Sequence, residues 1–218
     1  MFIKRSGIKE MSKTDRRIIR TKSEIKQAFF SLLSEKNFEA ITVRDITERA
    51  NINRGTFYLH YVDKYNLLEQ YENEMLEKFN VIFDEANKLE LNAHQFKNER
   101  LPIMIQILQV FYEEADFLRL ILGPNGDPFF QEKIRQFFVK YFKNYLLNHI
   151  NESQLKIPIE LIIAFNSNAL LGVITYWLQH DMQQSPEEIA NMLVEIILKG
   201  PFEASGLRSI FENKERWT

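Results

Sequence analysis

Apolar residues recur at helical spacing along most of the chain, and this periodicity limits the possible folds more than any other feature. In the segment 16–36, for example, Ile18, Ile25 and Phe29 fall on one helical face. Turn formers are scarce, with 7 Gly and 6 Pro in 218 residues, and no alternating strand pattern is present. The sequence therefore predicts an all-α fold of about nine helices.

The helical periods and their punctuation divide the chain into segments. Ser185, Pro186 and Glu188 form a complete helix start signal, with a capping serine and a glutamate three residues later. The run from Gly123 to Pro128 is the strongest turn signal in the chain. Beyond 16–36, we expect helices over 43–50, 54–61, 63–88, 101–114, 129–150, 158–180 and 185–200.

Charge is distributed unevenly along the chain, although the net charge is only −2. Residues 1–67 carry 14 Lys and Arg against 8 Asp and Glu, whereas residues 68–218 carry 14 against 22. This asymmetry indicates a basic N-terminal module that meets a polyanion and an acidic remainder that does not. The alternative is an unevenly charged, solvated surface.

Cysteine and membrane signals are missing from the sequence. The absence of Cys excludes disulfides, thiolate metal sites and a Cys nucleophile, which suits a cytoplasmic protein. The longest apolar run, 169–178, has ten residues, against about 18 for a spanning helix, so no membrane span is expected. Residues 1–13 read as a flexible basic tail without the apolar core of a signal peptide, and Met11 is a possible alternative start.

Two short helices joined by a tight turn lie near the N-terminus, between two longer ones. Thr42 is a suitable N-cap, with Asp45 three residues later near the positive end of the helix. Asn51 tolerates the left-handed conformation of a tight turn, and Asn53 can cap the next helix. This pattern predicts a helix-turn-helix whose second helix, 54–61, enters the major groove of DNA.

The same region resembles the DNA-binding domain of the TetR family of transcriptional regulators. The resemblance rests on ITVRDI at 41–46, RANINRGTFYLHY at 49–61 and VDKYNLL at 62–68. The sequence departs from the family pattern in ways that bear on operator preference more than on DNA binding. The family usually has Ala where Thr47 stands, Gly for Asn51, Ser or Thr for Asn53, and Phe for Tyr61.

The resemblance implies a DNA-binding domain over 14–75 and a divergent effector-binding and dimerization domain over 76–218. Gly55 would let the backbone approach a phosphate. Arg54 and Thr56 would contact either bases or phosphates, and Lys64 would contact a phosphate unless it is simply solvated. The DNA-contacting residues that the resemblance implies are Thr42, Arg44, Asn53, Arg54, Gly55, Thr56, Tyr58, His60, Tyr61 and Lys64.

Some side chains in this region have two readings that the sequence leaves open. Tyr58, His60 and Tyr61 either reach sugar-phosphate oxygens or brace the turn. The group Arg16, Arg17 and Arg20 either reaches DNA or forms a plain solvated basic face.

Thirteen aromatic residues crowd residues 101–180, and most of them must belong to a helical core. A pocket between helices for a small apolar or aromatic effector is also plausible, because such pockets are apolar with a few polar groups. The candidate lining residues are Phe111, Tyr112, Phe117, Phe137, Phe138, Tyr141, Phe165 and Asn168.

The segment 158–180 is apolar nearly all round, so more than one of its faces must be buried. A second copy of the chain can cover one face, and the small Ala169 and Gly172 would allow close approach. The alternative is burial within the monomer. The candidate dimer residues are Ala169, Gly172, Tyr176, Ile189, Leu193, Ile196 and Ile197.

No catalytic, metal or cofactor site is expected, because the four His residues are scattered and no nucleophile pattern or phosphate-binding loop is present. The leading hypothesis is a ligand-responsive repressor that binds a palindromic operator in double-stranded DNA as a homodimer. The alternatives are a non-transcriptional DNA-binding protein on the same fold and a ligand carrier without DNA binding.

Overall fold

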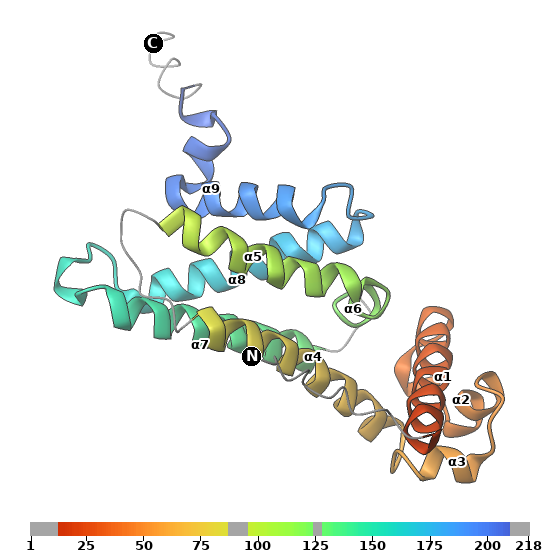
Figure 1. Cartoon of the computed structure of the whole chain (residues 1–218). Helices are drawn as coiled ribbons and strands as arrows, with labels where there is room; N and C mark the ends of the chain where they lie inside the picture. Colours follow the sequence, from red (N-terminus) through yellow and green to blue (C-terminus); the bar gives the residue numbers. More distant parts are fainter. Residues whose placement is uncertain (1–12, 87–95, 124–127, 210–218) are drawn as a thin grey trace, which may run out of the picture. The chain divides into compact units, whose positions relative to one another are not determined.

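A computed structural model describes residues 13–86, 96–123 and 128–209 of the chain. Over these residues all regular elements are helical, with nine α-helices, which confirms the all-α prediction (Figure 1). The expected tail at 1–12, the expected end of a helix at 88 and the interior of the predicted turn at 124–127 lie outside the described residues.

The chain divides into two compact units, Met1–Gln70 and Tyr71–Thr218. The boundary falls within one long helix, α4, and slightly before the boundary at 75 that the sequence suggested. The first unit contains α1 (Lys13–Glu35), the short 3-10 helix η1 (Phe38–Ala40), α2 (Val43–Arg49), α3 (Arg54–Tyr58) and the start of α4 (Lys64–Ala86).

The core of the first unit joins all of its helices. Ile25 and Phe29 of α1, Ile46 of α2, Phe57 of α3 and Leu67 of α4 are fully buried. Burying side chains of this size stabilises a fold by about 1.5–3 kcal/mol each. Ile25 and Phe29, which the helical periodicity identified, therefore fix α2 against α1, whereas Ile18, predicted on the same face, is 40% exposed.

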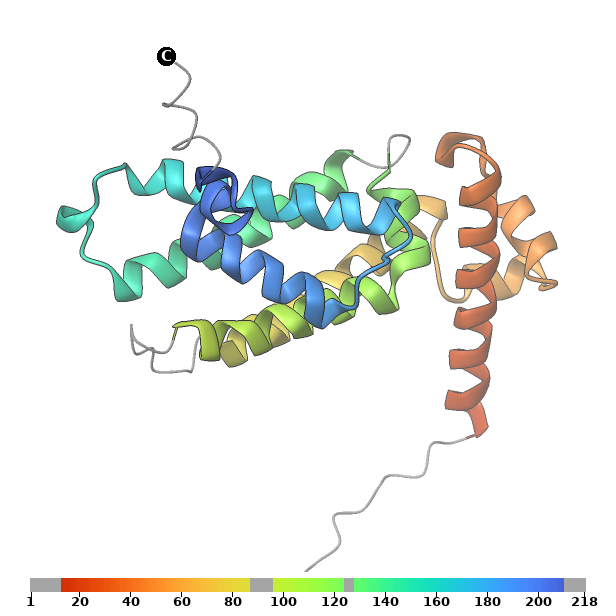
Figure 2. The same ribbon diagram turned by 90° about the horizontal axis from the view of Figure 1, so that it is seen from above.

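The second unit is a helical bundle made by the rest of α4 and five further helices (Figures 1 and 2). Helix α5 packs along α9, α7 along α8, and α6 against α8. The helices are α5 (Phe96–Glu113), α6 (Ala115–Ile121), α7 (Pro128–His149), α8 (Ile159–Gln179) and α9 (Pro186–Ala204), with the 3-10 helix η3 (Glu152–Gln154) between α7 and α8.

Two ion pairs tie α4 to its neighbours in this bundle. The carboxylate of Glu72, which is buried, lies 2.6 Å from the ammonium of Lys133 on α7. The ammonium of Lys78 lies 2.6 Å from Glu114, at the junction of α5 and α6. Because Glu72 is buried, removal of Lys133 would weaken the compensation of its charge in the bundle.

Several element boundaries differ from the prediction. Helix α3 ends at Tyr58 rather than Tyr61, and α6 was not expected as a separate helix. The break between α5 and α6 lies at Glu114, where ψ is 21°, and neither Gly nor Pro marks it in the sequence. Helix α9 is interrupted at Gly200, whose φ of 76° no helix allows, and Pro201 begins its final segment.

Helix α8 is 21 residues long and, by length and composition alone, apolar enough to cross a bilayer. The ten-residue apolar run from which no membrane span was expected covers only part of this helix. A third of its most apolar window is buried within the bundle, and core helices of globular proteins pass the same test. One such helix does not by itself indicate a membrane protein.

Candidate nucleic-acid interface

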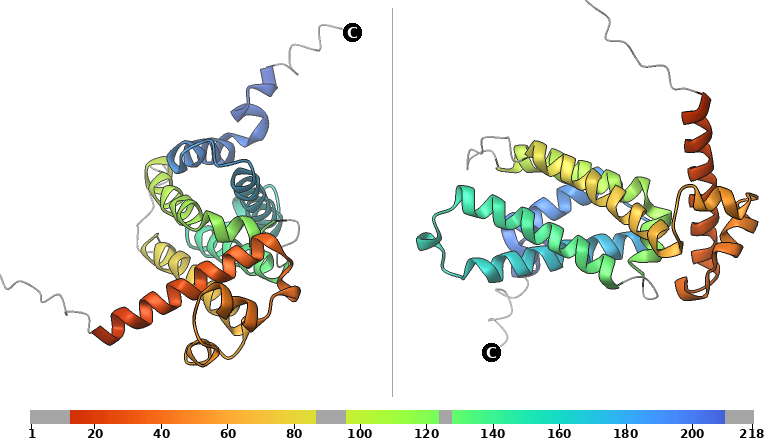
Figure 3. Two further views of the ribbon diagram at one scale, coloured as in Figure 1. Left: turned by 90° about the vertical axis from the view of Figure 1, so that its right-hand side faces the viewer. Right: turned by 90° about the horizontal axis from the view of Figure 1, so that it is seen from below.

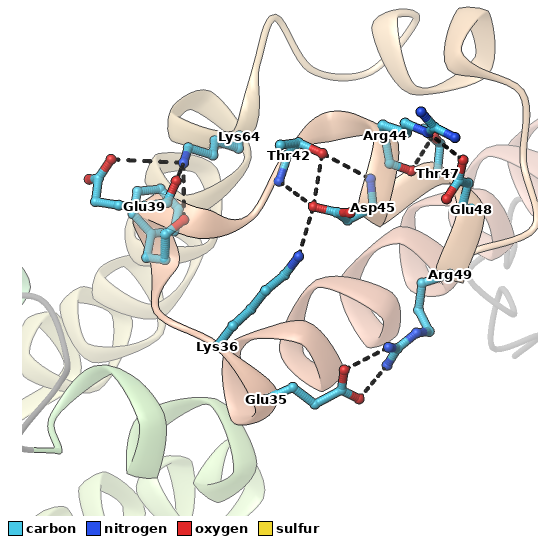
Figure 4. A network of polar contacts seen from close by, with 11 residues as sticks. Glu35, Lys36, Glu39, Thr42, Arg44, Asp45, Thr47, Glu48, Arg49 and Lys64 are labelled. Carbon is cyan, nitrogen blue, oxygen red and sulfur yellow. Dashed lines mark hydrogen bonds and ion pairs between the residues drawn. The ribbon is translucent and has the colours of Figure 1, made fainter.

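Helix α2 follows Thr42, the N-cap that the sequence predicted, and the structure adds a reciprocal capping box with Asp45 (Figure 4). The backbone N–H of Asp45 donates to the hydroxyl of Thr42 at 3.2 Å, and the Thr42 N–H donates to the Asp45 carboxylate at 2.8 Å. Lys36, which directly follows the last residue of α1, donates to the same carboxylate at 2.8 Å. The hydrogen bond from Lys36 and those from Thr42 lower the pKa of Asp45 to about 2.

The turn between α2 and α3 is held by its backbone. Asn51 has a φ of +51°, the left-handed conformation expected of it. The N–H of Ile52 donates to the carbonyl of Thr47 at 3.0 Å, and the buried Thr47 hydroxyl donates to the carbonyl of Arg44 at 3.0 Å. The bond from Ile52 closes the turn, whereas the bond from the Thr47 hydroxyl lies within α2.

A bidentate ion pair attaches the end of α2 to α1 (Figure 4). Both terminal nitrogens of Arg49 donate to the Glu35 carboxylate at 2.7 Å. These hydrogen bonds lower the pKa of Glu35 below its usual value. Because both side chains are exposed, the pair sets geometry more than it adds stability.

The outer face of α3 presents the side chains expected of a recognition helix. Arg54 is exposed, and no ion pair or hydrogen bond to it occurs within the described residues. Tyr58 is 57% exposed, whereas Phe57 points into the core. An open polar recess of about 760 Å³ lies beside this face. It is lined by Arg44, Thr47, Glu48, Asn51, Ile52, Asn53 and Arg54.

Asn53 and Gly55 lie at the start of α3, and no contact within the protein requires either residue type at its position. Asn53 is the N-cap by position, but its side chain makes no capping bond, contrary to the expectation. At Gly55 an added Cβ would meet nothing within 4 Å. The free protein therefore has no internal need for glycine here, which agrees with the close approach of an external group.

Tyr61 does not lie on the outer face. Its ring is 3% exposed and packs against Phe57 at 5.5 Å between centroids. The ring of the half-buried His60 lies 6.3 Å from the Tyr61 ring, measured between centroids. Of the two readings of Tyr61, the structure favours the brace for the turn.

Lys64 is also placed differently from the expectation of a solvated or phosphate-bound amine. Its ammonium donates to the carbonyls of Phe38 and Glu39, the first two residues of η1, at 3.0 and 2.9 Å. It also lies over the rings of Phe38 and Tyr65, at 4.7 and 5.1 Å from their centroids. With the Lys64 side chain only 12% exposed, the amine joins α4 to η1.

Two further residues that were expected to contact DNA have partners within the first unit. The Thr42 hydroxyl belongs to the capping box, and Arg44 pairs with Glu48 one turn along α2 at 2.7 Å. Leu59, which was not among the residues expected at DNA, is 80% exposed beside the recognition helix. The sequence could have indicated this exposure only because Leu59 is an apolar residue that does not fall on the buried face of the helix.

Five of the eight effector candidates lie in the second unit as buried or half-buried rings: Phe111, Phe117, Phe137, Phe138 and Tyr141. Phe111, Phe117 and Phe138 are fully or almost fully buried. Phe137 packs on the ring of Phe79 at 5.6 Å, and the ring of Tyr141 stacks on that of Phe83 at 4.0 Å. This aromatic group is continuous across α4, α5 and α7, and its role towards an effector stays a prediction.

The other effector candidates lie apart from this group. Tyr112 is 47% exposed, with its ring 6.3 Å from that of Trp177. Phe165 is 61% exposed on α8, and the amide of the exposed Asn168 donates to the carbonyl of Ala164 at 2.7 Å. Phe165 and Asn168 therefore face outward from the subunit.

One face of α8 carries an exposed stripe at helical spacing. It includes three of the dimer candidates. It also includes Leu161 and Phe165, which the sequence places on the same helical side but which were not among the dimer candidates. The stripe consists of Leu161, Phe165, Ala169, Gly172 and Tyr176.

The dimer candidates on α9 are less accessible. Ile189 and Leu193 are buried within the subunit, where α9 packs along α5, so they belong to the core rather than to a free surface. Ile196 and Ile197 are half-buried. Within the described residues, no group of three or more His, Cys, Asp or Glu could hold a metal ion.

Two family models match the two units of the chain. Residues 27–71 match the bacterial regulatory proteins of the tetR family, and residues 98–199 match a transcriptional regulator C-terminal region. The chain belongs to the TetR family. The helix-turn-helix described above is thus a TetR-type one, and the second unit holds the family's C-terminal region.

This TetR-family chain also resembles individual proteins. It is 26% identical over 186 residues to the uncharacterized HTH-type transcriptional regulator YxbF of Bacillus subtilis, covering 83% of the chain and 45% of that protein. The chain thus spans about half the length of this relative. The solved structures below show the same fold over nearly their whole length.

A TetR transcriptional regulator from Streptococcus agalactiae is 24% identical, with a TM-score of 0.59, over 84% of this chain and 97% of the other. The regulator FadR from Bacillus subtilis, in complex with stearoyl-CoA, is 13% identical, with a TM-score of 0.59, over 82% and 98%.

Proposed function

We propose that this chain is a DNA-binding transcriptional repressor that acts in the cytoplasm. The observation that carries the proposal is the outer face of α3, where Arg54, Tyr58 and the glycine backbone at 55 are open. The core, the capping box and the Arg49–Glu35 pair fix that face. A rigid helix with free cationic and aromatic side chains suits the major groove and its flanking phosphates.

The side chains divide into those that would contact DNA and those that would position them. Arg54 and Thr56 would read bases, and Tyr58 and the Gly55 backbone would approach phosphates. Asn53, whose amide makes no cap, is available to either. Tyr61 and Lys64 would act indirectly, by holding the turn and η1.

The repressor would act as a homodimer on a palindromic operator. The exposed stripe on α8 supports this, because a contiguous apolar face at helical spacing suits a second copy of itself. Two-fold symmetry places two recognition helices on half-sites about 34 Å apart, or a multiple of that distance.

A small apolar or aromatic effector would bind in the second unit and regulate DNA binding. The aromatic group around Phe79, Phe137 and Tyr141 supports an apolar ligand, and the complex of FadR with stearoyl-CoA is an example of an apolar chain held by this fold. An effector that discriminates between two conformations by about 1–3 kcal/mol would be enough to release the operator.

The decisive experiment is selection of duplexes from a random DNA pool by the purified protein at a stated salt concentration. We expect one palindrome to be enriched, and Arg54→Ala to bind it about 5- to 150-fold more weakly, because a bidentate base contact contributes about 1–3 kcal/mol. Lys143→Ala, an exposed cation on α7, is the matched control and should bind as the wild type does.

Other outcomes would replace this proposal. Salt-sensitive binding without any motif would indicate a non-transcriptional DNA-binding protein on the same fold. No binding to any duplex would favour a ligand carrier.

A further inference from the structure

The first half of α1 is a basic arm whose first turns lie outside the core of the first unit. Residues Asp15 to Arg20 are all exposed, and the first buried side chain of α1 is Ile25. In Figures 2 and 3 these first turns extend past α2 and α3. We define residues 15–24 as the α1 arm, which spans about 15 Å.

The charges of this arm are arranged against helix stability. Between residues 15 and 24 the helix carries four basic and two acidic residues, near its N-terminus, where the macrodipole disfavours cations. Arg20 lies three and four residues after Arg17 and Arg16, the spacing at which like charges repel. The last turn of α1 has no basic residue to balance this distribution.

Internal partners neutralise only part of this charge. Arg20 pairs with Glu24 at 2.8 Å on the solvated surface. For Arg16 and Arg17, both exposed, no ion pair or hydrogen bond is found within residues 13–86, 96–123 and 128–209. Guanidinium ions that repel one another near the positive end of the helix dipole destabilise this part of α1. An external anion bound to them would reduce that repulsion.

The position of the arm indicates which anion would bind to Arg16 and Arg17. The ammonium of Lys22, near the C-terminal end of the arm, lies 5.8 Å from the centre of the Tyr61 ring. This end of the arm is therefore close to the residues that follow the recognition helix. The family model starts only at Gln27, so the arm lies outside the matched region. A duplex carries one phosphate per about 3.4 Å of each strand, so an arm of this length can span several.

We propose that the α1 arm binds the DNA phosphate backbone flanking each half-site, through Arg16 and Arg17. This inference rests on the proposed DNA-binding function and extends the interface beyond the major groove. The arm would add affinity and salt dependence without reading sequence. The exposed Ile18 and Ile19, 40% and 55% accessible, would lie against the sugars.

The test compares the wild type with Arg16→Ala/Arg17→Ala on the selected operator, by fluorescence anisotropy over a series of salt concentrations. We expect the slope of log K against log salt to fall by about 1 for every phosphate that the variant no longer neutralises in each subunit. The control is Lys140→Ala/Lys143→Ala, which removes the same charge from exposed positions on α7.

A second measurement uses duplexes trimmed to the palindrome itself. Wild-type affinity should fall on trimming, whereas the arm variant should bind both lengths equally. An unchanged slope in the arm variant, or an equal fall in the control, would overturn the proposal while leaving operator binding intact. Failure of the wild type to bind any duplex would instead refute the proposed function.

Discussion

At the scale of single residues, Lys64 shows how bonding inside the protein can explain a position that the family pattern assigns to DNA. Two backbone carbonyls of η1 and two aromatic rings surround its ammonium. We expect Lys64→Met to lower the free energy of unfolding by about 1–2 kcal/mol, because the variant cannot make the hydrogen bonds of a charged donor. Urea denaturation followed by circular dichroism measures this.

The same variant separates the two roles of this side chain. If Lys64 only joins α4 to η1, the salt slope of operator binding in Lys64→Met stays that of the wild type. A slope reduced by about 1 per subunit at unchanged stability would instead show a phosphate contact.

At the scale of elements, the start of α2 makes stability depend on pH. The pKa of Asp45 is about 2 in the folded protein, because Lys36 and Thr42 stabilise its charged form. A lowered pKa contributes stability that is complete above the ordinary value near 4 and disappears as the pH falls towards 2. We expect Asp45→Asn to be less stable by about 1 kcal/mol at pH 7.

Urea unfolding from pH 7 to pH 2.5 checks this behaviour. The difference between Asp45→Asn and the wild type should shrink below pH 4. Asp84→Asn, an exposed carboxylate on α4, is the control and should show no comparable effect. A difference that stays constant with pH would mean that the charge of Asp45 plays no part.

The elements that were predictable from the sequence are those specified within three or four residues. The N-cap at Thr42, the capping box at Ser185 and the left-handed Asn51 are local signals, and the structure confirms all three. The break at Glu114 carries no such signal. The carbonyl partners of Lys64 lie about 25 residues away in sequence, so only the tertiary fold reveals them.

At the scale of the whole molecule, the exposed stripe on α8 makes oligomeric state a test of the proposed repressor. Phe165→Arg places a charge on this stripe in both copies, where like charges across a two-fold axis cost several kcal/mol. We expect the dimer Kd to rise about 100-fold or more in sedimentation equilibrium. Val81→Arg, at a similarly exposed apolar residue of α4, should leave the Kd unchanged. An unchanged Kd in Phe165→Arg would place the subunit interface elsewhere.

Gly55 and Gly172 both lie on exposed helical faces where an added methyl group would touch nothing in the chain. Alanine at either position would stabilise its helix by about 0.5–1 kcal/mol. A population selected only for heat resistance should therefore drift towards alanine at 55, whereas at 172 a second copy packed on the α8 stripe would oppose the change. A population selected for an occupied operator should keep glycine at 55, so the two pressures act on that codon in opposite directions.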